Sequence, residues 1–167
     1  MKSTMIALAA VALLASQHMA AAGDEPGFVG QGLVGQVRKA NGRFETVAQA
    51  IKEGYAPIPC TSGVDGGAMG IHFVNADLIK DENLDITKPE AVMYEPDEHG
   101  KMKLVAVEYI TTKGPANLGG QLFSFTGAPN RYGLPAFYEL HVWAWKDNPK
   151  GPFSDMNPQV SCRHAHG

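Results

Sequence analysis

The segments 103-KLVAVEYIT-111 and 137-FYELHVWAW-145 decide the fold, because both are long, rich in β-branched and aromatic residues, and free of glycine and proline. In each segment, apolar side chains occupy odd as well as even positions. Successive side chains of a strand point to opposite faces of its sheet. We therefore predict two central strands, each with both faces buried.

Other segments of similar composition complete the predicted sheet. The stretch 68-AMGIHFVN-75 follows the turn signal 65-DGG-67, and 91-AVMYE-95 is joined to the 103–111 strand by a short hairpin loop. A shorter strand is expected at 121–126. Hairpin-connected strands pair antiparallel, so we predict a mainly antiparallel sheet.

One helix is predicted at 41–53. Its apolar residues recur at the spacing of one helix face and are Phe44, Val47, Ala48 and Ile51. Asn41 is suited to cap the first free amides, and Gly54 to end the helix in a left-handed conformation. We expect this helix to pack on the sheet through its apolar stripe.

Composition limits the function classes. Glycine (19 residues) and proline (11 residues) are frequent in this chain of 167, which favours a turn-rich fold with strands over a helix bundle. The length suits one domain with one buried core. The formal net charge of −3 offers no basic surface for phosphates, so we do not expect a nucleic acid as a partner.

The first 22 residues are typical of a secretory signal peptide. Lys2 gives a positive start, 6-IALAAVALLA-15 is apolar, and small residues end the segment at Ala22. These ten apolar residues would rise about 15 Å as a helix, against about 30 Å of hydrocarbon in a bilayer. We predict cleavage after Ala22 and a periplasmic or secreted protein with no membrane span.

The remaining chain is predicted to have three parts. They are a flexible, glycine-rich N-terminal arm at 23–42, a single globular domain at 43–162 and a C-terminal tail at 163–167. The predicted fold class is α+β, with a compact, mainly antiparallel sheet and one packed N-terminal helix. One helix covers one sheet face, so the other needs loops, a second sheet or a partner subunit, and a homo-oligomer is one expectation.

Cys60 and Cys162 are the two cysteines of the chain, and an oxidising compartment allows them to pair. Neither belongs to a CxxC motif, and an unpaired thiol outside the cytoplasm tends to oxidise. We therefore predict one disulfide, worth about 4–5 kcal/mol in the chain-entropy description. A two-thiolate metal site or a reactive thiol is the alternative.

Ionisable side chains interrupt the apolar strands, and three of them are our candidate ligands: His72, Glu108 and His141. A buried carboxylate is costly unless it is paired, so Glu108 needs a partner in the fold. Two imidazoles and a carboxylate suit a divalent Zn, Mn, Fe or Cu ion. The pattern therefore predicts a metal or small-ligand site within the sheet.

Glu139 and Glu95 are outside candidates for the same site. Glu139 lies two residues before His141, so both side chains point to the same side of the strand. A simple hairpin would place Glu95 opposite Lys101 and on the face away from Glu108, unless a bulge intervenes. Arg131, in the stretch 130-NRYG-133, is interpreted as part of a turn, with anion or sugar binding as the alternative.

Three functions fit this pattern. The first is an exported small binding protein with a His/Glu site for a divalent metal or a small ligand. The second is a non-catalytic interaction protein, in which the buried His and Glu residues only satisfy one another. The third is a small hydrolase or lyase-like enzyme that uses Glu108 or Glu139 with His141 in acid–base chemistry. No catalytic motif identifies its catalytic residues.

A set of segments in a fixed order resembles a family of exported bacterial proteins of unassigned function. These segments are 67-GAMGIHFVN-75, 90-EAVMYEPD-97, 103-KLVAVEYI-110, 130-NRYGLPAFYELHVWAWKDNP-149 and 157-NPQVSC-162. The resemblance implies a shared fold and brings no activity, cofactor or catalytic residues. The stretches 94-YEP-96 and 104-LVAVEYI-110 are also faintly similar to plant oil body-associated proteins.

Overall fold

The computed structural model describes residues 26–63 and 66–165, so the expected signal peptide lies outside the described residues. Within them, seven strands form a single sheet in which every pair of neighbours is antiparallel. The sheet order is β1 (Ala56–Pro57), β3 (Ala68–Val74), β4 (Ala91–Pro96), β5 (Met102–Thr111), β9 (Phe137–Val142) and β8 (Ser124–Thr126). β2 (Thr61–Ser62) also pairs with β3. The predicted α+β class with a mainly antiparallel sheet is confirmed.

Two smaller features complete the strands and connections. β6 (Asn117–Leu118) and β7 (Gln121–Leu122) pair with each other outside the main sheet. The short helix α3 (Ala76–Asp81) follows β3, and Asn75 caps it by accepting hydrogen bonds from the amides of Asp77 and Leu78. No helix of the described part of the chain is long and apolar enough to cross a membrane.

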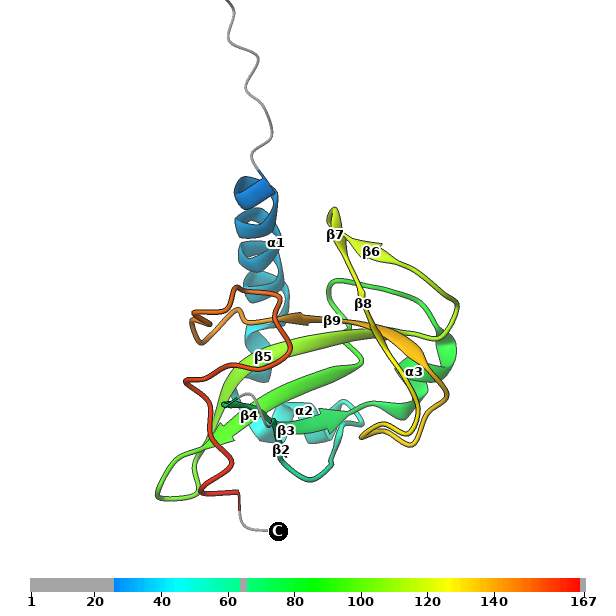
Figure 1. Cartoon of the computed structure of the whole chain (residues 1–167). Coiled ribbons are helices and arrows are strands. Elements are labelled where there is room, and N and C mark those ends of the chain that lie inside the picture. The colour runs from blue at the N-terminus through cyan, green and yellow to red at the C-terminus, as the bar shows by residue number, and fades with distance from the viewer. Residues whose placement is uncertain (1–25, 64–65, 166–167) are drawn as a thin grey trace, which may run out of the picture.

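Helix α1 (Pro26–Asn41) forms where we expected a flexible arm. That prediction is wrong, because Leu33 and Val37, four residues apart, are buried against the sheet. Tertiary burial of one helix face outweighs the poor helix propensity of the glycines around it. Figure 1 shows the C-terminal end of α1 reaching strand β5.

The helix predicted at 41–53 is broken in two. The structure has a 3₁₀ turn η1 (Gly42–Glu45) followed by α2 (Val47–Lys52). Asn41 does not cap either piece; it ends α1, and its side-chain amide donates to the carbonyl oxygens of Val37 and Ile86. The break rotates the predicted stripe, so Phe44 is buried while Ile51 is 58% exposed.

The two faces of the sheet have different coverings. On the helix face, the helices pack on an apolar cluster that includes Phe73, Val92, Tyr94, Val107, Tyr109 and Leu140. On the opposite face, here called the loop face, the segment after β9 packs on a second cluster that includes Ala68, Met93, Ala106, Trp143 and Val160. The chain therefore covers both faces itself, and the sheet needs no partner subunit for burial.

The hairpin between β4 and β5 contains a register shift. Met93 pairs with Ala106 but the next residue, Tyr94, pairs with Leu104, so Val105 is the extra residue of a β-bulge. Glu95 consequently pairs with Lys103, whereas a simple hairpin would pair it with Lys101. The bulge puts Glu95 on the same face as Glu108, the loop face.

The predicted disulfide is confirmed. Cys60 and Cys162 are bonded, 102 residues apart in the chain. The bond ties the C-terminal segment to the connection before β2. Two further contacts hold this segment on the loop face: Asn157 and Ala68 exchange backbone hydrogen bonds of 3.1 Å in both directions.

Candidate metal centre

The three predicted ligands meet on the loop face. Glu108 on β5 is paired directly with His141 on β9, and on its other side with Ala91 on β4. His72 lies on β3, one strand further along, opposite Met93. The imidazole of His72 reaches diagonally across β4, from the level of Met93 to that of Ala91, to the carboxylate of Glu108.

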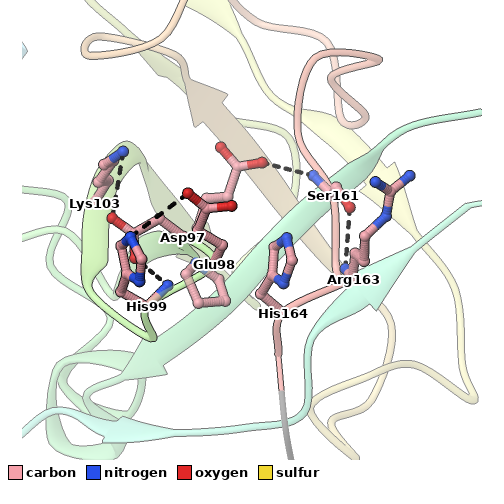
Figure 2. Close-up of a pocket in the computed structure, with 9 residues that line it drawn as sticks. Asp97, Glu98, His99, Lys103, Ser161, Arg163 and His164 are labelled. Carbon is pink, nitrogen blue, oxygen red and sulfur yellow. Dashed lines mark hydrogen bonds and ion pairs between the residues drawn. The ribbon is translucent and has the colours of Figure 1, made fainter.

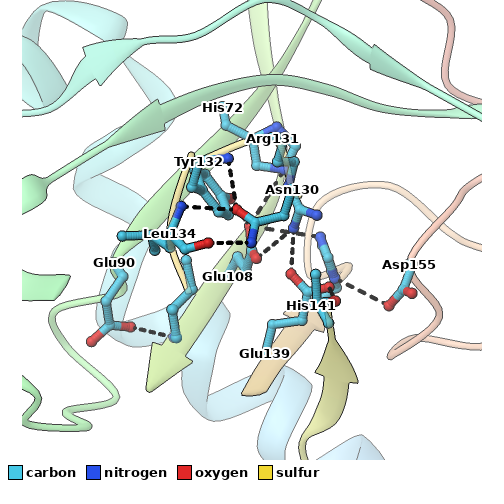
Figure 3. Close-up of polar contacts among 12 residues, drawn as sticks. His72, Glu90, Glu108, Asn130, Arg131, Tyr132, Leu134, Glu139, His141 and Asp155 are labelled. Carbon is cyan, nitrogen blue, oxygen red and sulfur yellow. Dashed lines mark hydrogen bonds and ion pairs between the residues drawn. The ribbon is translucent and has the colours of Figure 1, made fainter. Parts of the chain in front are cut away.

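The distances within this cluster are short. Nε2 of His72 lies 3.4 Å from Oε2 of Glu108, and Nε2 of His141 lies 3.7 Å from the same oxygen. One ligand atom of each residue lies within 4.8 Å of the other two. All three side chains have 0% exposure, and Figure 3 shows them together with Arg131 and Tyr132, which come from the loop after β8.

Both imidazoles lack hydrogen bonds to the rest of the described chain. The nitrogens Nδ1 and Nε2 of His72 and of His141 are buried, and none of the four has a partner with hydrogen-bond geometry among the described residues. Buried polar atoms are nearly always satisfied in folded proteins. The Nε2 atoms of both rings face the carboxylate of Glu108, and such a cluster indicates a place where another group can supply the missing interactions.

Arg131 and Tyr132 cover the cluster of His72, Glu108 and His141. Arg131 Nη2 donates to Glu108 Oε1 at 2.6 Å and also to Glu139 Oε2, while the Tyr132 hydroxyl donates to Glu108 Oε2. The Arg131 side chain is 14% exposed, so it separates the cluster from solvent. The stretch 130-NRYG-133 is thus a turn, as predicted, and it supplies the partners that the buried Glu108 required.

Asn130 shapes this covering loop. Its side-chain amide donates to the carbonyl oxygens of Leu134 at 2.8 Å and Gly127 at 3.1 Å. Its side-chain oxygen accepts from the amides of Tyr132 and Leu134, both at 3.2 Å. A single amide side chain therefore ties both halves of the loop together and fixes the positions from which Arg131 and Tyr132 point inward.

The environment changes the proton affinities of the cluster. Burial raises the pKa of Glu108 well above its usual value, although Arg131 opposes this. Burial also lowers the pKa of His72 well below its usual value, and Arg131 and His141 add to the effect. The surroundings of the cluster therefore favour the neutral forms of both Glu108 and His72.

Glu139 is the ionised carboxylate of the group. Burial alone would raise its pKa, but the hydrogen bond with Glu108 and the nearby charges of His141 and Arg131 lower the pKa to about 2. Its side chain is 1% exposed and belongs to a second group of potential ligands, Glu139, His141 and Asp155. The outside candidate Glu139 thus lies beside the predicted ligands.

Glu95 does not join them. Lys146 donates to its Oε2, and the amide of Ser161 donates to its Oε1 at 2.9 Å. Glu95 instead lines a surface pocket of about 450 Å³, shown in Figure 2, together with His99 and His164. The bulge puts Glu95 on the correct face, but it lies at the far end of the strand.

Asp155 is a site residue that the sequence did not reveal. Its Oδ1 lies 3.4 Å from Nδ1 of His141, and its side chain is 48% exposed. It lies in the irregular segment after β9, where no periodicity indicates the direction of a side chain. The same reason explains why the contacts of Arg131 and Tyr132 could not be assigned from the sequence.

Glu90 is a buried carboxyl group that sequence reasoning missed. It has 0% exposure, its Oε2 accepts from the amide of Ile110 at 2.9 Å, and its Oε1 has no hydrogen-bond partner among the described residues. Burial raises its pKa to about 8, while the hydrogen bond from Ile110 opposes this rise. The available signal in the sequence was the position of Glu90 between Pro89 and the buried strand β4.

Comparisons with protein-family models, with curated proteins and with solved structures gave no match to this chain. The resemblance to exported bacterial proteins, and the fainter one to plant oil body-associated proteins, therefore stay predictions. Inference about function rests on the geometry of the site.

Proposed function

We propose that this protein binds a divalent transition-metal ion through His72, Glu108 and His141. The observation that carries the proposal is the convergence of two imidazoles, with no hydrogen-bonded nitrogen, on one buried carboxylate. Two ligand atoms at about 2.0 Å from one tetrahedral ion lie about 3.3 Å apart. The separations of 3.4 Å and 3.7 Å therefore need little adjustment.

The charges around the cluster favour a dication. Glu108, Glu139 and Asp155 supply three carboxylates, and Arg131 supplies one guanidinium. With all of them ionised, the excess of negative charge matches the charge of a divalent ion. Glu108 gives up its proton when the ion binds, because metal ligands bind in the deprotonated form.

The ligand set narrows the choice of ion. Two nitrogens and one carboxylate oxygen suit Zn, Mn, Fe and Cu better than they suit Mg or Ca, which prefer oxygen ligands. Three protein ligands leave coordination positions for water or a small ligand. We propose that the protein acts outside the cytoplasm, in line with the expected signal peptide and with the disulfide Cys60–Cys162.

One observation favours a second candidate function. Both oxygens of Glu108 already accept hydrogen bonds, from Arg131 and from Tyr132. A closed polar network of this kind specifies a core without binding a metal. In that case the protein is a non-catalytic interaction protein, and its buried histidines serve the fold alone.

Metal titration of tag-free protein distinguishes a metal-binding protein from a non-catalytic interaction protein. Protein stripped with a chelator is titrated with Zn²⁺, Mn²⁺, Fe²⁺ and Cu²⁺ by calorimetry, and the metal content is measured by elemental analysis. We expect one ion per chain for the wild type, and loss of that ion in the His72→Gln/His141→Gln double variant.

The matched control is the His99→Gln/His164→Gln double variant. It also removes two imidazoles, but from the surface pocket of Figure 2, so we expect it to keep the ion. Thermal unfolding of all variants verifies that each is folded. If wild-type protein takes up none of the four ions, or if the surface variant loses the ion instead, the proposed function is wrong.

A further inference from the structure

Resting on the proposed function, we propose that Asp155 is the positioning residue of the metal centre. Its Oδ1 lies 3.4 Å from Nδ1 of His141, so a proton on Nδ1 would point toward this carboxylate and leave the lone pair of Nε2 free for the ion. Metal-binding histidines commonly donate their second ring nitrogen to a carboxylate in this way. Asp155 is not itself a ligand in this arrangement, and it acts through His141.

The two nitrogens of His141 face two different carboxylates. Nδ1 lies 3.4 Å from Asp155, and Nε2 lies 3.7 Å from Glu108. A neutral imidazole carries one proton, so protonation at one nitrogen makes the other an acceptor. Nδ1 lies nearer to its carboxylate than Nε2 does, and Glu108 also faces Nε2 of His72 at 3.4 Å. In the proposed arrangement the proton of His141 is therefore held at Nδ1, on the side of Asp155.

The backbone around Asp155 is fixed despite its exposure. On one side, the indole nitrogen of Trp143 donates to the carbonyl oxygen of Ser154 at 2.6 Å. On the other side, Asn157 forms its pair of backbone hydrogen bonds with Ala68, and its side-chain amide donates to the carbonyl oxygen of Asp147 at 3.0 Å. A carboxylate held between two such anchors keeps its direction toward the imidazole.

Asp155 also gives the cluster its contact with solvent. The side chains of His72, Glu108 and His141 have no exposure, and that of Asp155 has 48%. An incoming cation therefore meets this carboxylate before it meets the ligands. Replacement of Asp155 should slow metal uptake as well as weaken binding.

The test compares Asp155→Asn with Asp147→Asn, in both cases as the full-length disulfide-bonded protein. Asp147 is an exposed acid of the same segment, and its substitution removes the same charge. We expect the dissociation constant for Zn²⁺ to rise about tenfold or more in Asp155→Asn and to stay unchanged in Asp147→Asn. Asp155→Glu, which restores the carboxylate, should recover part of the loss.

A second measurement does not depend on the metal. The ¹⁵N chemical shifts of the imidazole rings report which nitrogen carries the proton, and they can be measured on metal-free protein. We expect His141 to be protonated at Nδ1 in the wild type and to show a mixture of tautomers in Asp155→Asn. The ring shifts of His72 should not change.

The outcomes separate the two proposals. If wild-type protein binds no metal ion, the proposed function fails and the role of Asp155 in metal binding fails with it. If the wild type binds Zn²⁺ but Asp155→Asn has the wild-type affinity and the wild-type tautomer, the metal site stands and the positioning role is overturned.

Discussion

The two faces of the sheet differ in the polar groups that they bury and in how these groups are bonded. On the helix face, three tyrosines donate hydrogen bonds from their hydroxyls to backbone carbonyl oxygens. Tyr55 donates to Pro89, Tyr94 to Phe44 and Tyr109 to Ile86, at 2.6–2.7 Å. On the loop face, charged side chains and imidazoles lie at the centre, and loops cover them.

This difference shows where stability and chemistry reside. The phenol–carbonyl bonds of the helix face are neutral and complete, so they hold elements in place. The cluster of the loop face contains buried charges and nitrogens without partners, both of which cost free energy. A fold retains such groups most readily where they serve a function. Each of the following substitutions tests one side of this comparison.

The largest effect is expected for Arg131→Ala. The substitution leaves Glu108 and Glu139 buried together without their shared cation. Breaking a buried ion pair by removing one partner costs about 3–5 kcal/mol, and we expect urea denaturation to show a loss in this range. Arg163→Ala, at the surface, is the control and should have little effect.

A rescue variant sharpens the result for Arg131. Replacing all three charged groups, as Arg131→Met, Glu108→Gln and Glu139→Gln, removes the cation together with the anions that it pairs. We expect most of the lost stability to return. A small cost for Arg131→Ala alone would contradict the view that Arg131 holds the loop face together.

An intermediate effect, dependent on pH, is expected for Glu90→Gln. The pKa of Glu90 is about 8 in the folded protein, above its ordinary value of 4.5. The folded state therefore binds the proton more tightly, and the stability of the wild type should fall as pH rises through this range. At about 1.4 kcal/mol per pKa unit, the loss amounts to a few kcal/mol by pH 8.

Urea denaturation of wild type and Glu90→Gln at pH 5 and pH 8.5 measures this contribution. The variant has no proton to lose at this position, so its stability relative to the wild type should increase between the two pH values. An unchanged difference would mean that Glu90 is ionised in the fold.

The smallest effect is expected for Tyr94→Phe on the helix face. The substitution removes one hydroxyl and leaves the carbonyl oxygen of Phe44 buried without that donor. The expected cost is about 1–2 kcal/mol in the free energy of unfolding. Affinity for Zn²⁺ should not change, because the ring lies on the face away from His72 and Glu108. A changed affinity would show that the two faces are coupled.

The long strands could be predicted from the sequence. β3, β4 and β5 begin and end within a residue or two of the predicted segments, because their side chains are apolar on both faces. The fourth prediction, 137–145, extends too far. β9 ends at Val142, and the amide of Trp143 then bonds to the carbonyl oxygen of Pro152 in the segment that returns over the loop face.

Other elements depend on contacts that a linear pattern does not contain. The glycines of α1 disfavour a helix locally, and burial of Leu33 and Val37 against the sheet decides the outcome. The bulge at Val105 has no signal in the sequence of β5. Local sequence patterns predict the presence of a strand more reliably than its pairing register or the segments that pack on it.

The candidate site divides in the same way. His72, Glu108 and His141 were identifiable because each interrupts an apolar strand, and the side of a strand follows from its alternation. Their partners Arg131, Tyr132 and Asp155 lie in irregular segments, where neighbouring residues do not determine the direction of a side chain. The sequence therefore indicated the interior of the site but not what encloses it.

The bond between Cys60 and Cys162 makes the enclosure sensitive to redox conditions. All of the long strands lie between these two residues, so the bond closes a loop around the sheet and fastens the C-terminal segment over it. Both cysteines line an apolar pocket of about 610 Å³. Reduction would remove the covalent tie next to Val160, and the cover of the loop face would then depend on its hydrogen bonds and apolar contacts alone.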